Sequence, residues 1–318
     1  MGEVSRGFRA MNTNVVAVVV TDDGDRADAK IALAEVEALF AEIEAALSRF
    51  RPDSELSRLN RSAGQPFPAS TLLYAVVDEA LATARATGGL FDPTVLGALV
   101  AAGYDRSFEL LPSRPLGSFP ASGDTVRRTA RRSDWRDVCL APETRTITVP
   151  PGCGLDLGGI GKGWAVDRAA ETLRRFRSFA IDAGGDIYAS GHQADGTLWT
   201  IGVENPHDPT FSLLVLAVRD RAVATSTTAR RRWQKNGRTQ HHLIDPRTGE
   251  PSQSGVVAAT VVADSVARAE TLAKVALLLG PLAGLSILNA QPGVEGLLVL
   301  VDRRWIESAG FHEVRNGT

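Results

Sequence analysis

Cysteine, long apolar runs and an excess of charge of either sign are all scarce in this chain. Cys139 and Cys153 are its two cysteines, and they form no CxxC pair, which argues against a disulfide framework and a cysteine metal site. No stretch approaches the roughly 20 apolar residues that span a bilayer. The formal net charge of −2 gives no electrostatic reason to expect nucleic acid as a partner. These absences predict no membrane insertion and no nucleic-acid binding.

What remains is the composition of an ordinary globular protein. The chain has 318 residues, of which 44% are hydrophobic and 23% charged, enough for one large domain or two closely packed lobes. The N-terminal apolar run is short, is interrupted by Asn14 and leads into acidic residues, so it is typical of a strand and not of a signal peptide. An N-terminus without a signal-peptide pattern, together with the low cysteine content, predicts a cytoplasmic location.

Apolar periodicity predicts helices and strands that are interleaved along the chain. Apolar residues recur at steps of three and four between Leu33 and Leu47, which predicts a helix over about 27–50. Other helices are expected over about 70–87, 164–176 and 266–279, and strands over 15–20, 146–149, 178–181, 198–204, 213–219 and 256–263. Residues 105–137 are rich in Pro, Gly, Ser and Arg, which predicts an irregular segment. Its basic part, 127–136, is interpreted as a solvated surface rather than a binding patch.

The segment LDLGGIGKGWAVD, residues 155–167, concentrates an acid, several glycines and a lysine. A glycine-rich turn that opens a helix leaves backbone N–H groups facing an anion, and the helix dipole favours a phosphate there. Lys162 would add a mobile positive charge. The Walker A pattern fails at Asp156 and Gly163, and the dinucleotide fingerprint fails at Trp164. An ordinary tight turn is therefore as compatible with this segment as an anion site.

Four other groups of residues could carry chemistry. They are Met11-Asn12-Thr13, Phe91-Asp92-Pro93-Thr94, the run from Thr225 to Gly249, and the pair Glu270 and Lys274 at helical spacing. In the third group, His241 and His242 adjoin an Asp-Pro-x-Thr-Gly turn. Two of the five histidines thus lie side by side, which suits a general base because histidine titrates near neutral pH.

Taken in order, these segments resemble the FAD:protein FMN transferase family, often called ApbE. The matching segments are MNT, SRFRPDSELSRLN, LFDPTV, LDLGGIGKGWAVD, DAGGDIYASG, VATSTTARRRW, HHLIDPRTG and ARAETLAKVALLLG, and they extend from Met11 to Gly280. One such segment would be weak evidence for the family, but eight segments in the same order are highly specific evidence.

The resemblance implies an α+β fold with mixed sheets and packed helices. It implies a single catalytic domain over residues 1–318 that binds FAD in a cleft between two lobes. With Mg²⁺, such a protein transfers the FMN moiety of FAD to a threonine hydroxyl of an acceptor flavoprotein and releases AMP. By the same resemblance, His242 is the base, and the cofactor contacts are Met11, Phe50 (where the family usually has tyrosine), Leu90, Phe91, Asp92, Asp156, Lys162 and Leu243. Gly159, through its backbone carbonyl, and the positions of Glu270 and Lys274 would hold the metal.

The last helix departs from the family pattern at the metal site. Where the family reads Ala-Asp-x-x-x-Thr, this chain has Glu270 and Lys274. Glutamate can ligate Mg²⁺ with a longer reach, whereas a protonated lysine cannot ligate it. The two residues are also spaced for a helical ion pair.

Three hypotheses follow from this departure. The first is an FMN transferase in which Glu270 still holds Mg²⁺ or Lys274 supplies the missing charge. The second is a non-catalytic FAD-binding protein that serves as a flavin carrier or sensor. The third is an FAD pyrophosphatase that gives FMN and AMP.

Overall fold

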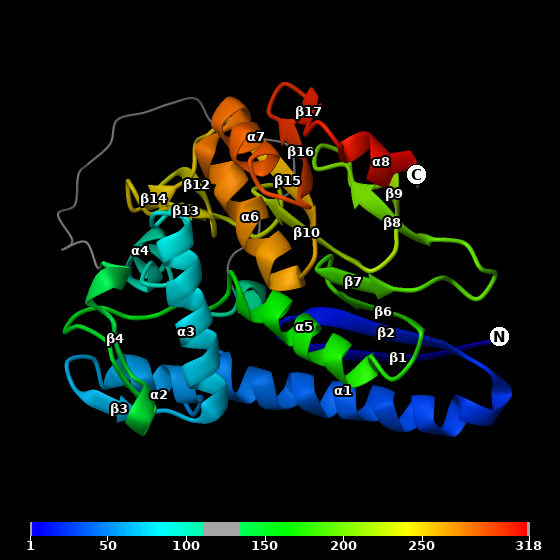
Figure 1. Ribbon diagram of the computed structural model, residues 1–318. Helices are drawn as coiled ribbons and strands as arrows, with labels where there is room; N and C mark the ends of the chain where they lie inside the picture. Colours follow the sequence, from blue (N-terminus) through cyan, green and yellow to red (C-terminus); the bar gives the residue numbers. More distant parts are fainter. Residues whose placement is uncertain (1, 111–133, 317–318) are drawn as a thin grey trace. The chain divides into compact units, whose positions relative to one another are not determined.

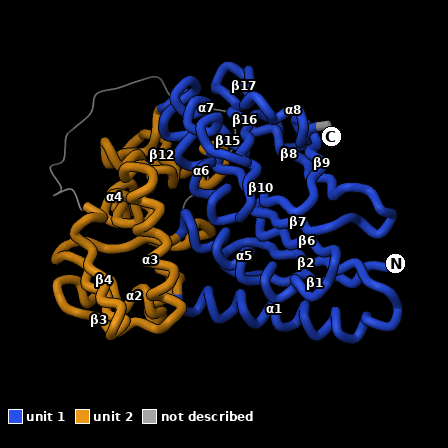
Figure 2. Tube along the Cα trace, in the orientation of Figure 1, with its two compact units in different colours: residues 1–46, 158–227, 254–318 blue, residues 47–157, 228–253 orange. Residues whose placement is uncertain are grey.

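The computed structural model describes residues 2–110 and 134–316, and the chain divides into two compact units (Figure 2). Unit 1 comprises residues 1–46, 158–227 and 254–318, and unit 2 comprises residues 47–157 and 228–253. Both units combine helices and strands, which confirms the predicted α+β class. Residues 111–133 of the predicted irregular segment lie outside the described residues. That the chain acts as a single catalytic domain with a cleft stays a prediction.

An eight-stranded sheet forms the centre of unit 1 (Figure 1). Its strands, in spatial order, are β1 (Gly2–Ala10), β2 (Thr13–Thr21), β6 (Ser178–Ala183), β7 (Ile187–Ser190), β10 (Arg221–Thr227), β15 (Val256–Ala263), β16 (Glu295–Leu300) and β17 (Trp305–Glu307). Each neighbouring pair is antiparallel. The sheet therefore joins segments from the beginning, middle and end of the chain.

Helices of unit 1 pack on this sheet. They are α1 (Arg26–Leu47), α5 (Gly161–Leu173), α6 (Val266–Leu279), α7 (Pro281–Asn289) and α8 (Phe311–Asn316). The apolar residues that predicted α1 are buried, because they line one face of the helix. Helix α6 covers β10 and β15, and α5 packs against α6 and β6. No helix within the described ranges is long and apolar enough to cross a membrane.

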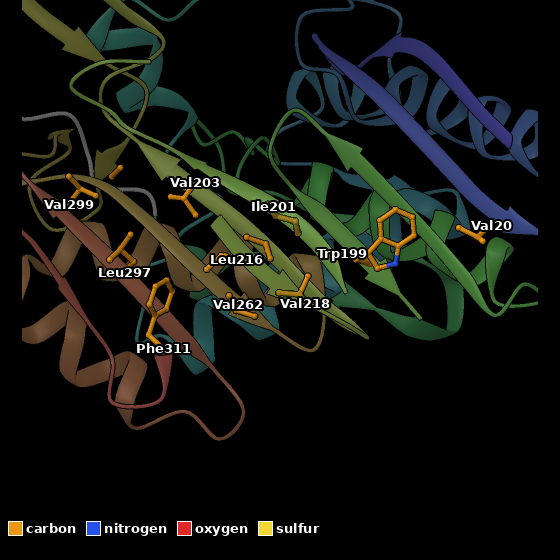
Figure 3. Close-up of a cluster of buried hydrophobic side chains, with 13 residues drawn as sticks. Val20, Trp199, Ile201, Val203, Leu216, Val218, Val262, Leu297, Val299 and Phe311 are labelled. Carbon is orange, nitrogen blue, oxygen red and sulfur yellow. The ribbon is translucent and has the colours of Figure 1, made fainter. Parts of the chain in front are cut away.

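A hairpin of β8 (Trp199–Glu204) and β9 (Ser212–Val218) supplies much of the core of unit 1 (Figure 3). Trp199, Ile201 and Val203 alternate with more exposed residues along β8, as expected for a strand with one buried face. They cluster with Val262 of β15 and with Phe311 of α8. All eight residues of β15 are buried, so this strand lies at the core of the unit.

Unit 2 is built from short elements. Its helices are α2 (Glu55–Arg61), α3 (Thr71–Ala86) and α4 (Leu96–Ala102), and its strands are β3 (Pro66–Pro68), β4 (Cys139–Ala141), β5 (Thr146–Thr148), β11 (Arg232–Lys235), β12 (Arg238–His241), β13 (Ile244–Asp245) and β14 (Glu250–Pro251). Ser54 caps α2 by accepting from the Ser57 N–H at 3.0 Å, as its sequence position predicts. Ser70 caps α3 in the same way through the Leu73 N–H.

Candidate functional site

Met11 lies in a tight turn that connects β1 to β2. Ala10 pairs with Thr13 across the turn, and Met11 and Asn12 have φ angles of 50° and 60°. Two consecutive positive φ angles are typical of a type I′ hairpin turn, which usually contains Asn or Gly. A Cβ on Gly184 would lie 2.0 Å from the Thr13 hydroxyl, so the Met-Asn-Thr turn and the Gly184-Gly185 turn lie against each other within unit 1.

The glycine-rich segment positions helix α5 against helix α6. A Cβ on Gly163 would lie 2.8 Å from backbone atoms of Val266 and Ala267, so this close approach requires glycine. Both oxygens of Asp167 accept hydrogen bonds from the first turn of α6, at 2.8 Å from the Val266 N–H and 2.9 Å from the Ala267 N–H. The segment therefore holds α6, and with it Glu270, in a fixed position.

A compact charged cluster, formed by Lys162, Asp186 and Glu270, lies at the beginning of α5. The Lys162 ammonium makes a short ion pair with Asp186 and lies 3.4 Å from Glu270 Oε1. The other oxygen of Glu270 accepts from the Gly163 N–H at 2.9 Å. The side chains are 16%, 3% and 8% exposed, respectively. The sequence indicated an anion at this helix terminus, and in the structure the Glu270 carboxylate occupies that position.

This donor set does not suit Mg²⁺. The ion demands near-octahedral oxygen coordination, which proteins usually supply as one or two carboxylates with water or substrate phosphates. Both Glu270 oxygens are already engaged by the Gly163 N–H and the Lys162 ammonium. Within residues 2–110 and 134–316, no group of three or more His, Cys, Asp or Glu side chains could hold a metal. Gly159 is buried in the turn before α5, and the proposed role of its carbonyl stays a prediction.

Asp156 and Phe50 are linked in unit 2 by Arg49, which the sequence analysis did not single out. Arg49 Nε lies 2.5 Å from Asp156 Oδ2, and the arginine side chain is 8% exposed. The guanidinium carbon lies 4.1 Å from the ring centroid of Phe50 and 4.6 Å from that of Tyr104, within the range of cation–π attraction. Tyr104 in turn stacks on Trp233 at 5.3 Å. One buried guanidinium therefore fixes both predicted residues.

Two further contacts connect the predicted segments of unit 2. Asn60 donates to the Leu155 carbonyl at 2.9 Å and accepts from the Leu155 N–H at 2.7 Å. The Asp156 N–H donates to the Pro93 carbonyl at 2.8 Å. The segments around Asn60, Pro93 and Asp156, distant in sequence, are thus held together by the Asn60 side chain and by one backbone hydrogen bond.

The loop that contains Leu90, Phe91 and Asp92 is half-buried. Phe91 is 2% exposed, so its ring packs in the interior of unit 2, and its contact with the cofactor stays a prediction. Asp92 Oδ1 accepts from the Thr94 N–H at 2.7 Å and from its hydroxyl at 2.6 Å. Burial raises the pKa of Asp92 above its usual value, although the two bonds from Thr94 oppose the shift.

The adjacent histidines have different environments. His241 is buried, its Nε2 lies 3.0 Å from the Ser252 carbonyl, and its Nδ1 accepts from the Leu243 N–H at 3.3 Å. Burial lowers the pKa of His241 to about 4, so this ring is neutral at physiological pH and donates through Nε2. His242 is half-buried and Leu243 is buried. Of the two, His241 has a structural role, which leaves His242 as the candidate base.

Sequence reasoning missed two of the charged side chains in these groups, Arg49 and Asp186. Arg49 directly precedes Phe50, but nothing local marks an arginine in an Arg-rich chain as buried. Asp186 follows the Gly184-Gly185 turn and does not cap a helix. An acid in that position could have been recognised as a candidate site residue. The chain passes from unit 2 to unit 1 between Leu157 and Gly158, so the predicted site residues are divided between the two units.

Comparison with known proteins places the chain in a family. The ApbE family profile matches residues 11–298. The FAD:protein FMN transferase of Treponema pallidum is 33% identical, covering 90% of this chain and 81% of that protein. The flavin transferase ApbE from Vibrio cholerae has a solved structure with a TM-score of 0.80 and 28% identity, covering 98% of this chain and 99% of that one. The ApbE protein from Thermotoga maritima shares the fold, with a TM-score of 0.84 and 24% identity over 99% of both chains. The chain belongs to the ApbE family.

Proposed function

We propose that this chain transfers the FMN moiety of FAD to a threonine hydroxyl of an acceptor flavoprotein and releases AMP. The observation that carries the proposal is the family match over residues 11–298, joined to a relative of 33% identity that bears the name FAD:protein FMN transferase. Of the eight segments that carry the sequence resemblance, LDLGGIGKGWAVD, DAGGDIYASG and ARAETLAKVALLLG meet in the charged cluster of Lys162, Asp186 and Glu270.

The transfer is a displacement at phosphorus. The threonine oxygen forms a bond to the FMN phosphorus, the bond from that phosphorus to the bridging oxygen breaks, and AMP leaves with the bridging oxygen. The hydroxyl proton passes to His242, which acts as general base. The contacts of His241 with Ser252 and Leu243 support this assignment, because they hold the chain next to His242. Burial keeps the His241 ring neutral.

Binding of FAD is assigned to the residues that the family resemblance indicates. They are Met11, Phe50, Leu90, Phe91, Asp92, Asp156, Lys162 and Leu243. The environment of Lys162 supports its role, since its ammonium is slightly exposed and is held by two carboxylates. Asp156 is similarly held by Arg49. Catalysis of phosphoryl displacement rests mainly on such fixed charges and on positioning.

The names of the relatives favour transfer over the alternatives of flavin storage and FAD hydrolysis. One assay separates the three. FAD is incubated with the protein and a threonine-containing flavinylation-site peptide, and both AMP and flavin-modified peptide are measured. Transfer gives both products in equal amounts, hydrolysis gives AMP without modified peptide, and a flavin carrier gives neither product while binding FAD.

A variant of His242 tests the base within the same assay. His242→Gln should lower kcat by about 10²- to 10⁴-fold, the usual contribution of general acid–base catalysis, with a small effect on FAD binding. His312, an exposed histidine of α8, supplies the matched control His312→Gln, which should leave kcat unchanged. A His242→Gln protein with the kcat of the parent would remove His242 from the mechanism.

A further inference from the structure

The charged cluster of unit 1 contains its own cation where a metal ion would be expected. We infer that this chain carries out the proposed transfer without a divalent cation, and that Lys162 and Lys274 supply the positive charge. This inference rests on the proposed function and concerns the same site. Its first support is that the Lys162 ammonium contacts the carboxylates of both Asp186 and Glu270. A metal ion bridging these two acids would have to displace that ammonium.

The second support is the shortage of oxygen ligands around Glu270. One oxygen of this side chain accepts the Gly163 N–H at 2.9 Å, and the other lies 3.4 Å from Lys162 Nζ. Gly163 lies so close to α6 that an added Cβ would be 2.8 Å from backbone atoms of Val266 and Ala267, so its N–H is held in place by the packing of α5 on α6. Glu270 is thus fixed in a hydrogen-bonding role, whereas Mg²⁺ ligands must be able to meet a strict octahedron.

The third support is the charge at residue 274. Lys274 follows Glu270 by four residues on α6, so the two side chains project from the same side of the helix. A hydroxyl at this position could ligate a metal, but a protonated ammonium cannot. Lys274 thus adds a positive charge to α6, the helix that carries Glu270, at the position where the family pattern offers a hydroxyl ligand.

The use of lysine at these positions stands out against the composition. The chain has only four lysines, Lys30, Lys162, Lys235 and Lys274, among 35 basic residues. Lys162 belongs to the charged cluster, and Lys274 lies on α6 four residues after Glu270. Lysine carries a compact point charge, in contrast to the broad planar guanidinium of arginine, and is the side chain that more closely replaces a metal ion.

The test compares the parent protein with the double variant Glu270→Asp/Lys274→Thr, which supplies a shorter carboxylate and a hydroxyl. AMP release and peptide flavinylation are measured with FAD in EDTA and in excess MgCl₂. The parent should show equal rates in the two conditions. The double variant should lose at least about tenfold in EDTA and recover with MgCl₂, since the metal would then supply the missing charge. A parent protein that needs MgCl₂ for AMP release would overturn the inference while leaving the transferase proposal intact.

Binding of Mn²⁺, followed by electron paramagnetic resonance in the presence of FAD, gives a readout that does not depend on turnover. The parent should leave Mn²⁺ free, and the double variant should bind one equivalent. If no protein releases AMP under any condition, the proposed function fails, and Mn²⁺ binding still decides whether the parent holds a metal.

If the double variant does not fold, the single variant Lys274→Met tests the inference instead. It should lose AMP release in both EDTA and MgCl₂, without rescue by MgCl₂. The exposed Lys30 of α1 supplies the control Lys30→Met, which should behave as the parent.

Discussion

Arg49 joins the charged and aromatic residues of unit 2. Its guanidinium is buried, pairs with Asp156 at 2.5 Å and covers the rings of Phe50 and Tyr104. Arg49→Met would leave the Asp156 carboxylate without this partner. Breaking a buried ion pair from one side costs about 3 kcal/mol or more, so the variant should lose stability of that order in urea unfolding.

The neighbouring pair of Arg51 and Asp53 provides the control for this variant. Its side chains are 49% and 71% exposed, and its atoms are 3.2 Å apart. Because a solvent-exposed ion pair contributes about 1 kcal/mol or less, Arg51→Met should be nearly neutral. Equal losses for the two variants would mean that the Arg49 pair is not buried in solution.

His241 should make the stability of the protein depend on pH. The unfolded chain binds a proton at this histidine near pH 6.5, whereas the folded chain does so only near pH 4, because burial lowers the pKa. Between these values the unfolded state binds more protons, so stability falls as the pH is lowered through this window, by up to about 3 kcal/mol at 1.36 kcal/mol per unit. Above pH 6.5 the contribution of His241 is fully present.

The measurement is urea unfolding of the parent and of His241→Gln from pH 4 to pH 7. Glutamine keeps an N–H that can reach the Ser252 carbonyl but does not titrate. The variant should therefore be less stable at pH 7 and lose less on acidification than the parent. Parallel curves for the two proteins would show that His241 is not held neutral by the fold.

At the scale of elements, the close packing of α5 on α6 should be disturbed by a single methyl group added at Gly163. The Cβ of Gly163→Ala would meet backbone atoms of α6 at 2.8 Å. Overpacking of this kind costs about 1–3 kcal/mol, and the shift of Gly163 would also weaken its hydrogen bond to Glu270. The expected result is a lower unfolding midpoint together with slower AMP release.

Gly97 is the matched control for Gly163. It is exposed in the first turn of α4 and has nothing within 4 Å of its Cβ position. Gly97→Ala should raise stability by about 0.5–1 kcal/mol, because glycine in a helix loses more conformational freedom on folding than alanine. The pair of variants therefore has opposite expected signs, and a stabilising Gly163→Ala would contradict the close packing of α5 on α6.

The sequence predicted long elements well and long-range contacts poorly. The predicted ends of the helix over 266–279 and of the strand over 256–263 agree with the observed ends. Both elements are rich in apolar residues and are flanked on each side by a polar residue or a glycine. Strand β1 was missed, since only Val4 and Ala10 of its nine residues are buried and its turn has no glycine. The pairing of Lys162 with Asp186 and the stack of Tyr104 on Trp233 join distant segments, and no local pattern encodes such pairs.

At the scale of the whole molecule, both units are assembled from separated stretches of chain. Unit 2 consists of residues 47–157 and 228–253, and unit 1 takes the stretches before, between and after them. The strand order runs from β1 at one edge to β16 and β17 at the other, so the large sheet is complete only after residues near the C-terminus have been added. A fold with so many distant pairings is expected to form slowly, because loop closure precedes the contacts that stabilise it.

Hydrogen exchange should resolve this assembly within one molecule. Strand β15 is buried along its whole length and pairs with both β10 and β16, so its amides should exchange only when unit 1 opens globally. Strand β17 pairs with β16 alone at the edge of the sheet, and Trp305 in it is exposed. Mass spectrometry of peptic peptides should therefore show early exchange in β17 and the latest exchange in β15.

The two peptides come from the same sample, so a difference in their exchange rates cannot arise from a difference in pH or temperature. Simultaneous exchange of the two would mean that edge and centre open together, and the sheet would then behave as one cooperative unit rather than as a protected centre with a labile edge.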